Sequence, residues 1–407
     1  MLTEKIKALA AQIADEVIAF RRDLHMHPEL SNEEHYTASR IAEELDKIEG
    51  MEVFRGLAGG TGVMGMLHGT KGEGKVVLLR ADIDALPVQE SDDNLLPGKR
   101  TCKSLNEGVM HACGHDAHAA WLLGSAKILS ALRDEICGTV KFVFQPGEEG
   151  GGGGPRMVQG SKVLENPAVD AVFAAHAWPE IDSGEMHVAH CAFGHAGGFS
   201  ITVTGKGGHG SWPHECIDPI AVSHQIYGGL QQIVSRRLHE TAARVLSVCT
   251  IQSGPQFKGN IIPDQCTMTG TLRSDRREVI AEMARLAEQI SKQIAEANDA
   301  TAEVTTRYGD AVINTPEAIP FALNAGAKIL GADKVKEDLM PHLGGEDFTE
   351  YITRVPGAYV FAGIATPETK GKFGLHSNKF VLDESVIPNM AAVFAQMAVD
   401  FIEKGSF

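Results

Sequence analysis

Apolar residues follow helical and strand spacing through the first part of the chain. Helical spacing appears at Ile6, Leu9, Ile13, Val17 and Ile18, and again at Ile41, Leu45 and Ile48. Short apolar runs at 76–79, 140–144 and 171–175 predict buried strands, with a helix at 118–132 between the first two. This alternation predicts a largely parallel sheet, in which ligands bind beyond the carboxyl ends of the strands. The residues at such ends are Asp82, Glu148, Glu149 and His176.

The pattern changes near Phe199. A period-two strand at 199–203 is the first of six elements, and the other five lie at 219–237, 245–251, 266–272, 277–297 and 304–307. Their order is β-α-β-β-α-β. That order is typical of a ferredoxin-like sandwich. Helix and strand signals of the first kind resume at 318–330, 358–361 and 384–402. We therefore predict the α/β class, with a mostly parallel domain formed by 1–190 and 308–407 and an inserted ferredoxin-like α+β domain at 191–307.

Composition and charge narrow the possible partners. Of the 407 residues, 43% are hydrophobic and 22% charged, as in soluble globular proteins. A formal net charge of −16 argues against binding to nucleic acid or to an anionic membrane, because both require a basic surface. Charges interrupt the N-terminal segment, so no signal peptide is expected, and no apolar stretch looks long enough to span a bilayer. These features favour a small, diffusible substrate.

The cysteines indicate a reducing compartment. There are seven, an odd number, and none forms a C-x-x-C pair. We therefore expect a cytoplasmic protein without disulfides. Six of them are expected to be small buried thiols: Cys102, Cys137, Cys191, Cys216, Cys249 and Cys266.

The segment 111–118, His-Ala-Cys-Gly-His-Asp-Ala-His, is the strongest chemical signal. It places histidines, a thiol and a carboxylate at the start of a predicted helix. Thiolate, imidazole and carboxylate are the ligands that suit zinc and similar metals. Cys113 and His115 can converge on one metal, whereas His111 and His118 are expected to pack or to support ligands. The alternative is a capped helix start with incidental histidines.

Two further strand ends carry candidate ligands. The turn 145–150 places Glu148 and Glu149 next to each other after a buried strand, so one can bind a metal while the other faces the substrate. Taken alone, the turn could also be a solvated acidic loop. His176 ends another buried strand, where a lone histidine is often structural. Together with the cysteine motif, both positions favour a metal centre.

These residues resemble the metallopeptidase and aminoacylase superfamily, in its hippurate hydrolase and indoleacetyl-amino-acid hydrolase branch. The resemblance covers almost the whole chain, in motifs at 22–29 (RDLHMHPE), 79–87 (LRADIDALP), 110–116 (MHACGHD), 148–150 (EEG), 205–209 (GKGGH), 260–263 (NIIP), 344–348 (GGEDF) and 375–377 (LHS). It implies metal ligands at Cys113, His115, Glu149, His176 and His376. Arg80 stands where peptidase branches carry a ligating histidine, so Cys113 marks the acylase branch. Ala-Ala precedes His176 where Gly-Leu is usual, a departure that concerns loop shape.

The resemblance also implies a mechanism and an assembly. We expect two divalent metal ions per subunit, whether zinc, manganese, cobalt or nickel, with Glu148 as general acid and base. It implies a homodimer, in which the inserted domain serves as lid and dimerisation domain and His209 donates to the oxyanion of the neighbouring subunit's substrate. Asp82 is a further catalytic candidate. Asn260 and Arg273 are expected substrate contacts, although Arg273 could also be an ordinary surface charge.

The function that follows is hydrolysis of the amide bond of N-acyl amino acids, hippurate-like or related. One alternative is a dipeptidase or carboxypeptidase with the same metal chemistry. Another is a binding subunit, or one half of a heteromeric hydrolase acting on aminobenzoyl-glutamate. All five ligand positions and Glu148 are present, so the sequence offers no support for an inactive chain.

Overall fold

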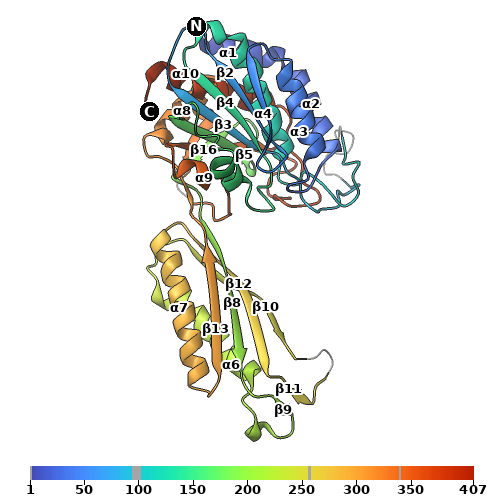
Figure 1. Cartoon of the computed structure of the whole chain (residues 1–407), viewed down its shortest axis with the longest axis vertical. Coiled ribbons are helices and arrows are strands. Elements are labelled where there is room, and N and C mark those ends of the chain that lie inside the picture. Colours follow the sequence, from blue (N-terminus) through green and yellow to red (C-terminus); the bar gives the residue numbers. More distant parts are fainter. Residues whose placement is uncertain (1, 94–101, 255–257, 339–340) are drawn as a thin grey trace. The chain divides into compact units, whose positions relative to one another are not determined.

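The computed structural model describes residues 2–93, 102–254, 258–338 and 341–407 (Figure 1). The chain divides into two compact units. Unit 1 comprises Met1–Ala192, Ile313–Met340 and Asp347–Phe407, and unit 2 comprises Phe193–Val312 and Pro341–Glu346. The sequence analysis predicted boundaries at 191 and 307. The structure also assigns the short segment Pro341–Glu346 to unit 2, which the sequence analysis placed with the first domain.

Unit 1 is built around an eight-stranded sheet of strand order β1-β2-β4-β3-β5-β16-β6-β15. The strands are β1 (Met51–Leu57), β2 (Gly62–His68), β3 (Val76–Asp82), β4 (Thr139–Gln145), β5 (Ala171–Asp182), β6 (Met186–Ala189), β15 (Val335–Asp338) and β16 (Gly357–Ala365). The central pairs β4–β3, β3–β5 and β5–β16 are parallel, as is β6–β15. The pairs β1–β2, β2–β4 and β16–β6 are antiparallel. The predicted α/β class with a mostly parallel sheet is confirmed, and the hairpin β1–β2 was not predicted.

The central strands are buried on both faces, as the continuous apolar runs predicted. All seven residues of β3 and all seven of β4 are buried. The helices of unit 1 are α1 (Leu2–Gln12), α2 (Ala14–Met26), α3 (His35–Asp46), α4 (His115–Ala131), α5 (Gly153–Pro155), α8 (Ala318–Leu330), α9 (Thr349–Ile352) and α10 (Val386–Lys404). The parallel strands β3, β4 and β5 therefore bring Asp82, Gln145 and His176 to the same level of the sheet. The expectation that the strand ends at His176 is wrong, because β5 continues to Asp182.

Helix α10 corrects one expectation from the sequence. By length and composition it could cross a membrane, which the sequence analysis had excluded for every stretch of the chain. In the structure 78% of this apolar window is buried. It packs against α4, where Phe394 lies 6.4 Å from Trp121 between ring centroids. A core helix meets the same criterion of length and composition, and the burial of α10 accounts for its apolar character.

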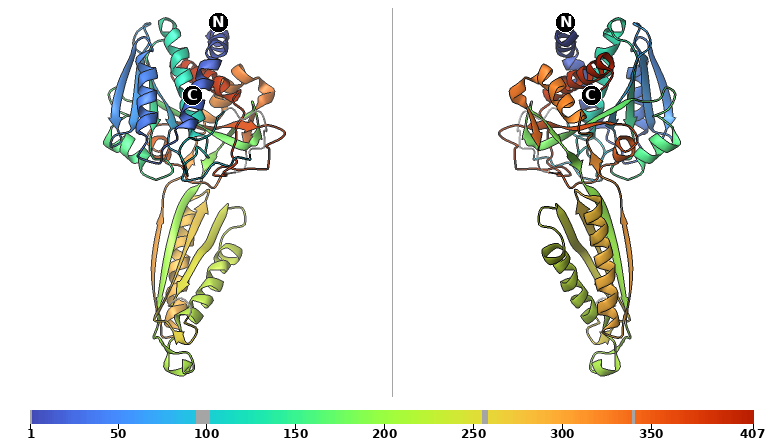
Figure 2. Two further views of the ribbon diagram at one scale, coloured as in Figure 1. Left: turned by 90° about the vertical axis from the view of Figure 1, so that its right-hand side faces the viewer. Right: turned by 90° about the vertical axis from the view of Figure 1, so that its left-hand side faces the viewer.

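Unit 2 has the predicted β-α-β-β-α-β order. Its strands β8 (His195–Thr204), β10 (Arg244–Ser253), β12 (Gln265–Ser274) and β13 (Thr301–Tyr308) form an antiparallel sheet of order β10-β12-β8-β13. Helices α6 (Pro219–Gln232) and α7 (Arg277–Glu296) pack against this sheet and against each other, and are yellow-green and gold in Figure 2. Helix α6 begins with Pro219 after the capping side chain of Asp218 and ends in a π turn at Ile233–Arg237. This strand order is that of a ferredoxin-like sandwich.

Short strands extend both units. Strands β9 (Gly208–His209) and β11 (Ile261–Ile262) form a short antiparallel ladder at one end of the unit 2 sheet (Figure 1). Strands β7 (Cys191–Phe193) and β14 (Val312–Ile313) pair with each other. The β9–β11 ladder pairs His209 with Ile261, which places His209 beside the segment that contains Asn260.

All seven cysteines lie among the described residues, and none of them is in a disulfide. Cys113, Cys191 and Cys266 are buried. The expectation that the other thiols are also buried is wrong for Cys249, which is exposed, and holds only in part for Cys102, Cys137 and Cys216. Cys249 lies on β10, at the edge of the sheet, where no further strand covers it.

Candidate metal centre

Cys113 and His115 are brought together by the turn that begins α4. Between them, Gly114 has a left-handed backbone (φ +90°), which side chains rarely adopt. A Cβ atom at this position would also lie 3.1 Å from Cβ of Ala177. Glycine therefore allows the loop to turn tightly against β5, so that the thiol and the imidazole on either side can face one site. Both side chains are buried.

The sulfur of Cys113 belongs to two groups of potential metal ligands. One group is Cys113, His115 and His176, and the other is Cys113, Glu149 and His376. In each group, one ligand atom from every residue lies within 4.8 Å of the others. A third group joins His115 to Glu148 and Glu149. The five residues proposed as ligands from the sequence therefore converge around one thiol.

Hydrogen bonds orient the two histidines of the first group. Nδ1 of His115 donates to Oδ1 of Asp84 at 3.1 Å, and its Nε2 is buried without a hydrogen-bond partner among the described residues. Nδ1 of His176 donates to the carbonyl of Ala177 at 2.8 Å, and its Nε2 lies 3.4 Å from Sγ of Cys113. Each ring thus uses Nδ1 as a hydrogen-bond donor, as metal-ligating histidines commonly do.

The second group depends on two unusual backbone positions. His376 has a φ of +65°, in the left-handed region that is uncommon for residues other than glycine. Its amide nitrogen donates to the carbonyl of Ala112 at 2.8 Å, which holds the loop against the cysteine turn. Nε2 of His376 lies 3.0 Å from Oε1 of Glu149. Glu149 follows Gly147 (φ +63°) in the acidic turn, and its own amide nitrogen donates to Asp84 at 2.9 Å.

Burial and charge shift the pKa values of these groups in different directions. Burial raises the pKa of the Cys113 thiol well above its ordinary value, although His115 acts in the opposite sense. Burial also lowers the pKa of His176, which keeps that ring neutral. For His115, burial is outweighed by the combined effect of the Asp82 carboxylate, Cys113 and the hydrogen bond to Asp84, which together raise its pKa. For Glu149, burial is outweighed by the hydrogen bond from His376 together with the charges of His115 and His376, which lower its pKa.

The donor set fits divalent transition metals. Thiolate, imidazole and carboxylate are their usual protein ligands, and a bound cation would stabilise the deprotonated thiol that burial disfavours. The partnerless Nε2 of His115, buried within the first group, is the atom that such an ion would satisfy. The residues present therefore fit the expected metals.

The family model for peptidase family M20/M25/M40 matches residues 78–400, which include all of these donors. The chain belongs to peptidase family M20/M25/M40. The resemblance predicted from the sequence motifs is confirmed.

Relatives in the M20 family cover nearly the whole chain. Thermostable carboxypeptidase 1 of Saccharolobus solfataricus is 38% identical over 99% of this chain and 100% of its own length. The N-acyl-L-amino acid amidohydrolase of Geobacillus stearothermophilus is 40% identical over 79% of this chain and 84% of its own. The YXEP protein of Bacillus subtilis, described as a dinuclear metal binding peptidase of the M20 family, has a TM-score of 0.80 at 33% identity and covers 97% of this chain and 99% of that one. The prediction that the chain is an amidohydrolase is confirmed.

In this M20 family chain, Asp82 lies next to His115, one of the proposed metal ligands. Its carboxylate accepts hydrogen bonds from Nδ1 of His118 at 2.5 Å and from Nη1 of Arg80 at 2.7 Å, and its Oδ1 is 3.8 Å from Nε2 of His115. His118 uses its other nitrogen to accept from the amide of Ala177 at 2.9 Å, so both ring nitrogens are engaged. This environment suits a residue that holds histidines in place, and a catalytic role for Asp82 stays a prediction.

Asp84 is the site residue that the sequence analysis missed. It is 1% exposed, and it accepts from His115, from the amide of Glu149 and from Oγ of Ser31, the last at 2.6 Å. The motif at 79–87 contains a usable signal, because Asp82 and Asp84 are two residues apart and project from the same face of an extended segment. Their partners could not be read from the motif, since they come from distant loops.

The three expected residues of unit 2 do not gather at one place. His209 and Asn260 lie together at the β9–β11 ladder, where Gly210 N donates to the carbonyl of Asn260 at 2.9 Å. Arg273 pairs with Ala196 on β8, whereas Gln265, nearer the β9–β11 ladder, pairs with Thr204. Eight residues of strand separate Gln265 from Arg273, which is about 26 Å at roughly 3.3 Å per residue. Within one chain, His209 and Arg273 are therefore at opposite ends of the unit 2 sheet.

The side chains in unit 2 have defined surroundings. Nδ1 of His209 accepts from the amide of Ser211 at 3.1 Å, and its ring lies 4.9 Å from that of Trp212. Nη1 of Arg273 donates to the carbonyls of Gly197 at 2.9 Å and Leu272 at 2.8 Å. Burial lowers the pKa of Arg273.

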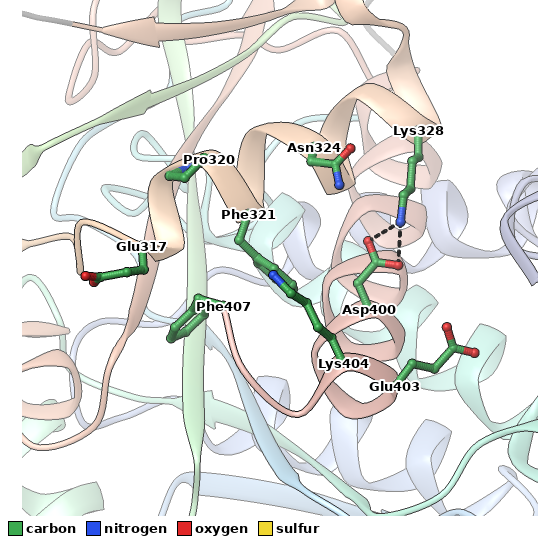
Figure 3. Close-up of a pocket in the computed structure, with 9 residues that line it drawn as sticks. All are labelled: Glu317, Pro320, Phe321, Asn324, Lys328, Asp400, Glu403, Lys404 and Phe407. Atoms are coloured by element: carbon green, nitrogen blue, oxygen red, sulfur yellow. Dashed lines mark hydrogen bonds and ion pairs between the residues drawn. The ribbon is translucent and has the colours of Figure 1, made fainter.

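A surface hollow of about 580 Å³ lies elsewhere in unit 1 (Figure 3). It is formed by α8, the end of α10 and the residues after it, with Phe321 and Phe407 along one side and a 2.8 Å ion pair between Lys328 and Asp400. None of the predicted site residues lines it. The donor chemistry, and not the size of this hollow, therefore identifies the candidate site.

Proposed function

We propose that this chain hydrolyses the amide bond of N-acyl amino acids with the help of two divalent metal ions. The position of Cys113 carries the proposal, because its sulfur is common to two groups of three ligands. Cys113, His115 and His176 would hold one ion, and Cys113, Glu149 and His376 the other. When bound, a pair of such ions polarises a carbonyl and lowers the pKa of water towards 7. Zinc, manganese, cobalt and nickel all suit this donor set.

Glu148 is proposed as the general acid and base. Its carboxylate lies within 4.8 Å of the ligand atoms of His115 and Glu149, so it borders the donor cluster. Glu149 is tied to Asp84 through its backbone and to His376 through its side chain. Glu148 would accept a proton from the attacking water and deliver it to the leaving amine. These contacts of Glu149 support its role as the metal ligand, and proton transfer is assigned to Glu148.

His209 is proposed as the donor to the oxyanion. Because Nδ1 accepts a hydrogen bond from the amide of Ser211, the proton of the neutral ring is on Nε2. This tautomer presents an N–H donor, which is what a developing oxyanion requires. Asn260, on the adjoining strand segment, is proposed as a second contact to the substrate.

The distance between His209 and Arg273 supports a site shared between two chains. An N-acyl amino acid is far shorter than the strand of about 26 Å between Gln265, near the β9–β11 ladder, and Arg273. If one substrate meets both residues, they come from different copies of the chain. We therefore propose a homodimer in which unit 2 acts as lid and dimerisation domain, with His209 from the partner and Arg273 gripping the substrate carboxylate.

A carboxypeptidase is the second candidate, and the relative from Saccharolobus solfataricus favours it. Both candidate substrates carry a free carboxylate next to the scissile amide. They differ on the acyl side, which is a simple acyl or aryl group in one case and a peptide chain in the other. The all-thiol state of the cysteines supports our further proposal of a cytoplasmic location.

The decisive experiment compares substrates under defined metals. Acetyl-, benzoyl-, indoleacetyl- and aminobenzoyl-amino acids would be assayed beside dipeptides and longer peptides, with each of the four metals added to chelator-treated protein. We expect the highest kcat/KM for an N-acyl amino acid. Higher kcat/KM for peptides with a free amine would establish the carboxypeptidase instead, and equal activity with and without metal would overturn both proposals.

A further inference from the structure

The acidic turn that carries Glu148 and Glu149 rests directly on residues 29–34, which we call the anchoring segment. A Cβ atom added at Gly147 would lie 2.5 Å from Oδ1 of Asn32, and one added at Gly150 would lie 2.4 Å from Cβ of Ser31. The turn therefore approaches this segment more closely than it could if residues with a Cβ atom stood at these two positions. The anchoring segment continues the motif at 22–29, to which the proposed mechanism assigns no role.

Glu34 connects the anchoring segment to the turn. It is 0% exposed, and its Oε1 accepts hydrogen bonds from the amides of Gly147 at 2.9 Å and Asn32 at 2.7 Å. Its Oε2 accepts from the hydroxyl of Thr61 at 2.7 Å. Burial raises the pKa of this carboxyl. Burying a carboxyl group costs free energy unless the group is hydrogen-bonded. One of the hydrogen bonds of Glu34 comes from the amide of Gly147, the residue just before Glu148.

The anchoring segment is itself held at several points. The Glu29 carboxylate accepts from the amides of Tyr36 and Thr37, each at 2.9 Å, at the start of α3. Its carbonyl accepts from the amide of Ala85 at 2.8 Å. Next to it, Ser31 donates to the same oxygen of Asp84 that accepts the amide of Glu149. These hydrogen bonds connect the residues after β3 to the acidic turn through the anchoring segment.

We propose that Glu34 is a positioning residue, which holds the backbone of the acidic turn where Glu148 can reach the substrate and Glu149 can reach a metal. The proposal rests on the function proposed above. Glu34 acts through the amide of Gly147 and touches neither substrate nor metal. The two oxygens of Glu34 can be tested separately. Oε1 accepts a hydrogen bond from Gly147 in the acidic turn, and Oε2 accepts one from Thr61 in the β1–β2 connection.

This separation gives a matched set of variants. Glu34→Ala removes the acceptor of the turn, and Thr61→Val removes a hydrogen bond to the same carboxylate without touching the turn. Glu34→Gln keeps an oxygen for the two amides and can donate its NH₂ to the Thr61 hydroxyl. If Glu34→Ala does not fold, Glu34→Met removes the same acceptor with a side chain of similar length.

Three readouts are needed. Hydrogen–deuterium exchange of peptides covering 146–150 reports the Gly147 amide. Bound zinc or manganese per chain reports Glu149, and kcat and KM on the best substrate of the screen report Glu148. We expect Glu34→Ala to exchange faster in this segment, to bind one ion more weakly and to lose kcat by about 10–100-fold, as for supporting residues of metal sites. KM should change little. Glu34→Gln should stay close to the parent in kcat, because it keeps an acceptor for the Gly147 amide, and Thr61→Val should match the parent.

Two outcomes would overturn the proposal. One is a Glu34→Ala or Glu34→Met protein that is folded and retains parental exchange, metal content and kcat. The other is an equal loss of kcat in Thr61→Val, which would make Glu34 a structural residue only. If the parent protein hydrolyses no candidate substrate, the proposed function fails, whereas exchange and metal content still decide the role of Glu34.

Discussion

Oδ1 of Asp84 accepts a hydrogen bond of 3.1 Å from Nδ1 of His115, while the other oxygen of the same carboxylate accepts the amide of Glu149 at 2.9 Å. One buried side chain therefore orients a ligand from each of the two groups that share Cys113. Burial opposes the charge on Asp84, but the hydrogen bonds from His115 and Ser31 and the charge of His115 together keep its pKa below the ordinary value. Asp84 is thus anionic and acts as an acceptor on both sides.

Asp84→Asn should weaken metal binding. The amide group of asparagine can accept from His115 or from Glu149 and Ser31, but its NH₂ end cannot accept at all. We expect a loss of about 10–100-fold in metal affinity, measured by competition with a chelator of known affinity. Asp182→Asn, at an exposed aspartate paired with Lys370, is the matched control. Equal affinity in the two variants would show that Asp84 does not orient the ligands.

Cys113 should affect both ions, because it belongs to both ligand groups. Cys113→Ala is expected to lose both metals, whereas His176→Ala and His376→Ala should each lose one. Metal per chain, measured after gel filtration, distinguishes these cases. Cys266→Ala, at a buried thiol of unit 2, should keep the parental content. A Cys113→Ala protein with full metal content and activity would show that the thiol only packs.

The acidic pair should separate catalysis from ligation. Glu148→Gln is expected to retain metal and to lose kcat by on the order of 10²–10⁴, which general acid–base catalysis usually contributes. Glu149→Gln should lose metal, because it removes a charged donor of the second group. Metal analysis and steady-state kinetics on the same preparations provide the test. The reverse pattern would exchange the two assignments.

His209→Ala should reduce kcat by roughly 10²–10³ with nearly unchanged folding and metal content, as when one oxyanion donor is deleted. Mixing this variant with Glu148→Gln tests the shared site. In a mixed dimer, one of the two sites regains both residues, so part of the activity should return. A mixture that demonstrably exchanges subunits and stays inactive would place His209 in its own chain's site or in none.

His111 should make unfolding depend on pH. Its ring is 1% exposed, neither nitrogen has a hydrogen-bond partner among the described residues, and burial lowers its pKa to about 4. The unfolded side chain takes up a proton near pH 6.5, so between about 6.5 and about 4 the unfolded state binds more protons. The free energy of unfolding should therefore decrease as the pH is lowered through this window, by up to about 3 kcal/mol from this group.

The control for that measurement is His111→Leu, which cannot take up the proton. Denaturant unfolding of chelator-treated protein would be followed at several pH values for both chains. The difference in free energy of unfolding between parent and variant should decline from about pH 6.5 to about 4 and then level off. A difference that is constant across this range would contradict the assignment.

The sequence predicted the elements whose residues pattern locally. We could predict β3, β4 and β5 from their continuous apolar runs, and the β-α-β-β-α-β order of unit 2 from the spacing of its apolar residues. Both patterns are local, because buried strands and amphipathic helices show their periodicity within a few residues. The hairpin β1–β2 was missed. Its first strand is only partly buried and its second contains Gly62 and Gly65, so neither shows a clear period-two pattern.

The candidate site was predictable as a set of donors and not as a network. Cys113 and His115 are neighbours in sequence, and the acidic pair ends a buried strand, so their chemistry could be recognised directly. Asp84, Ser31 and Glu34 act through partners that are remote in the chain, such as the pairing of Glu34 with Gly147. No local pattern encodes such a pair, because the contact exists only after the strands and loops have assembled.

The packing of α10 on α4 has a consequence for how the chain is made. The sequence of unit 2 lies between these helices, so α4 leaves the ribosome long before its partner. Until α10 arrives, the side of α4 that packs against it, which includes Trp121, lacks this partner, and a contact of such large sequence separation forms slowly. Most of unit 2, in contrast, is one continuous stretch, Phe193–Val312. Nascent unit 1 is therefore the part that needs protection from aggregation during synthesis, and unit 2 the part that can fold first.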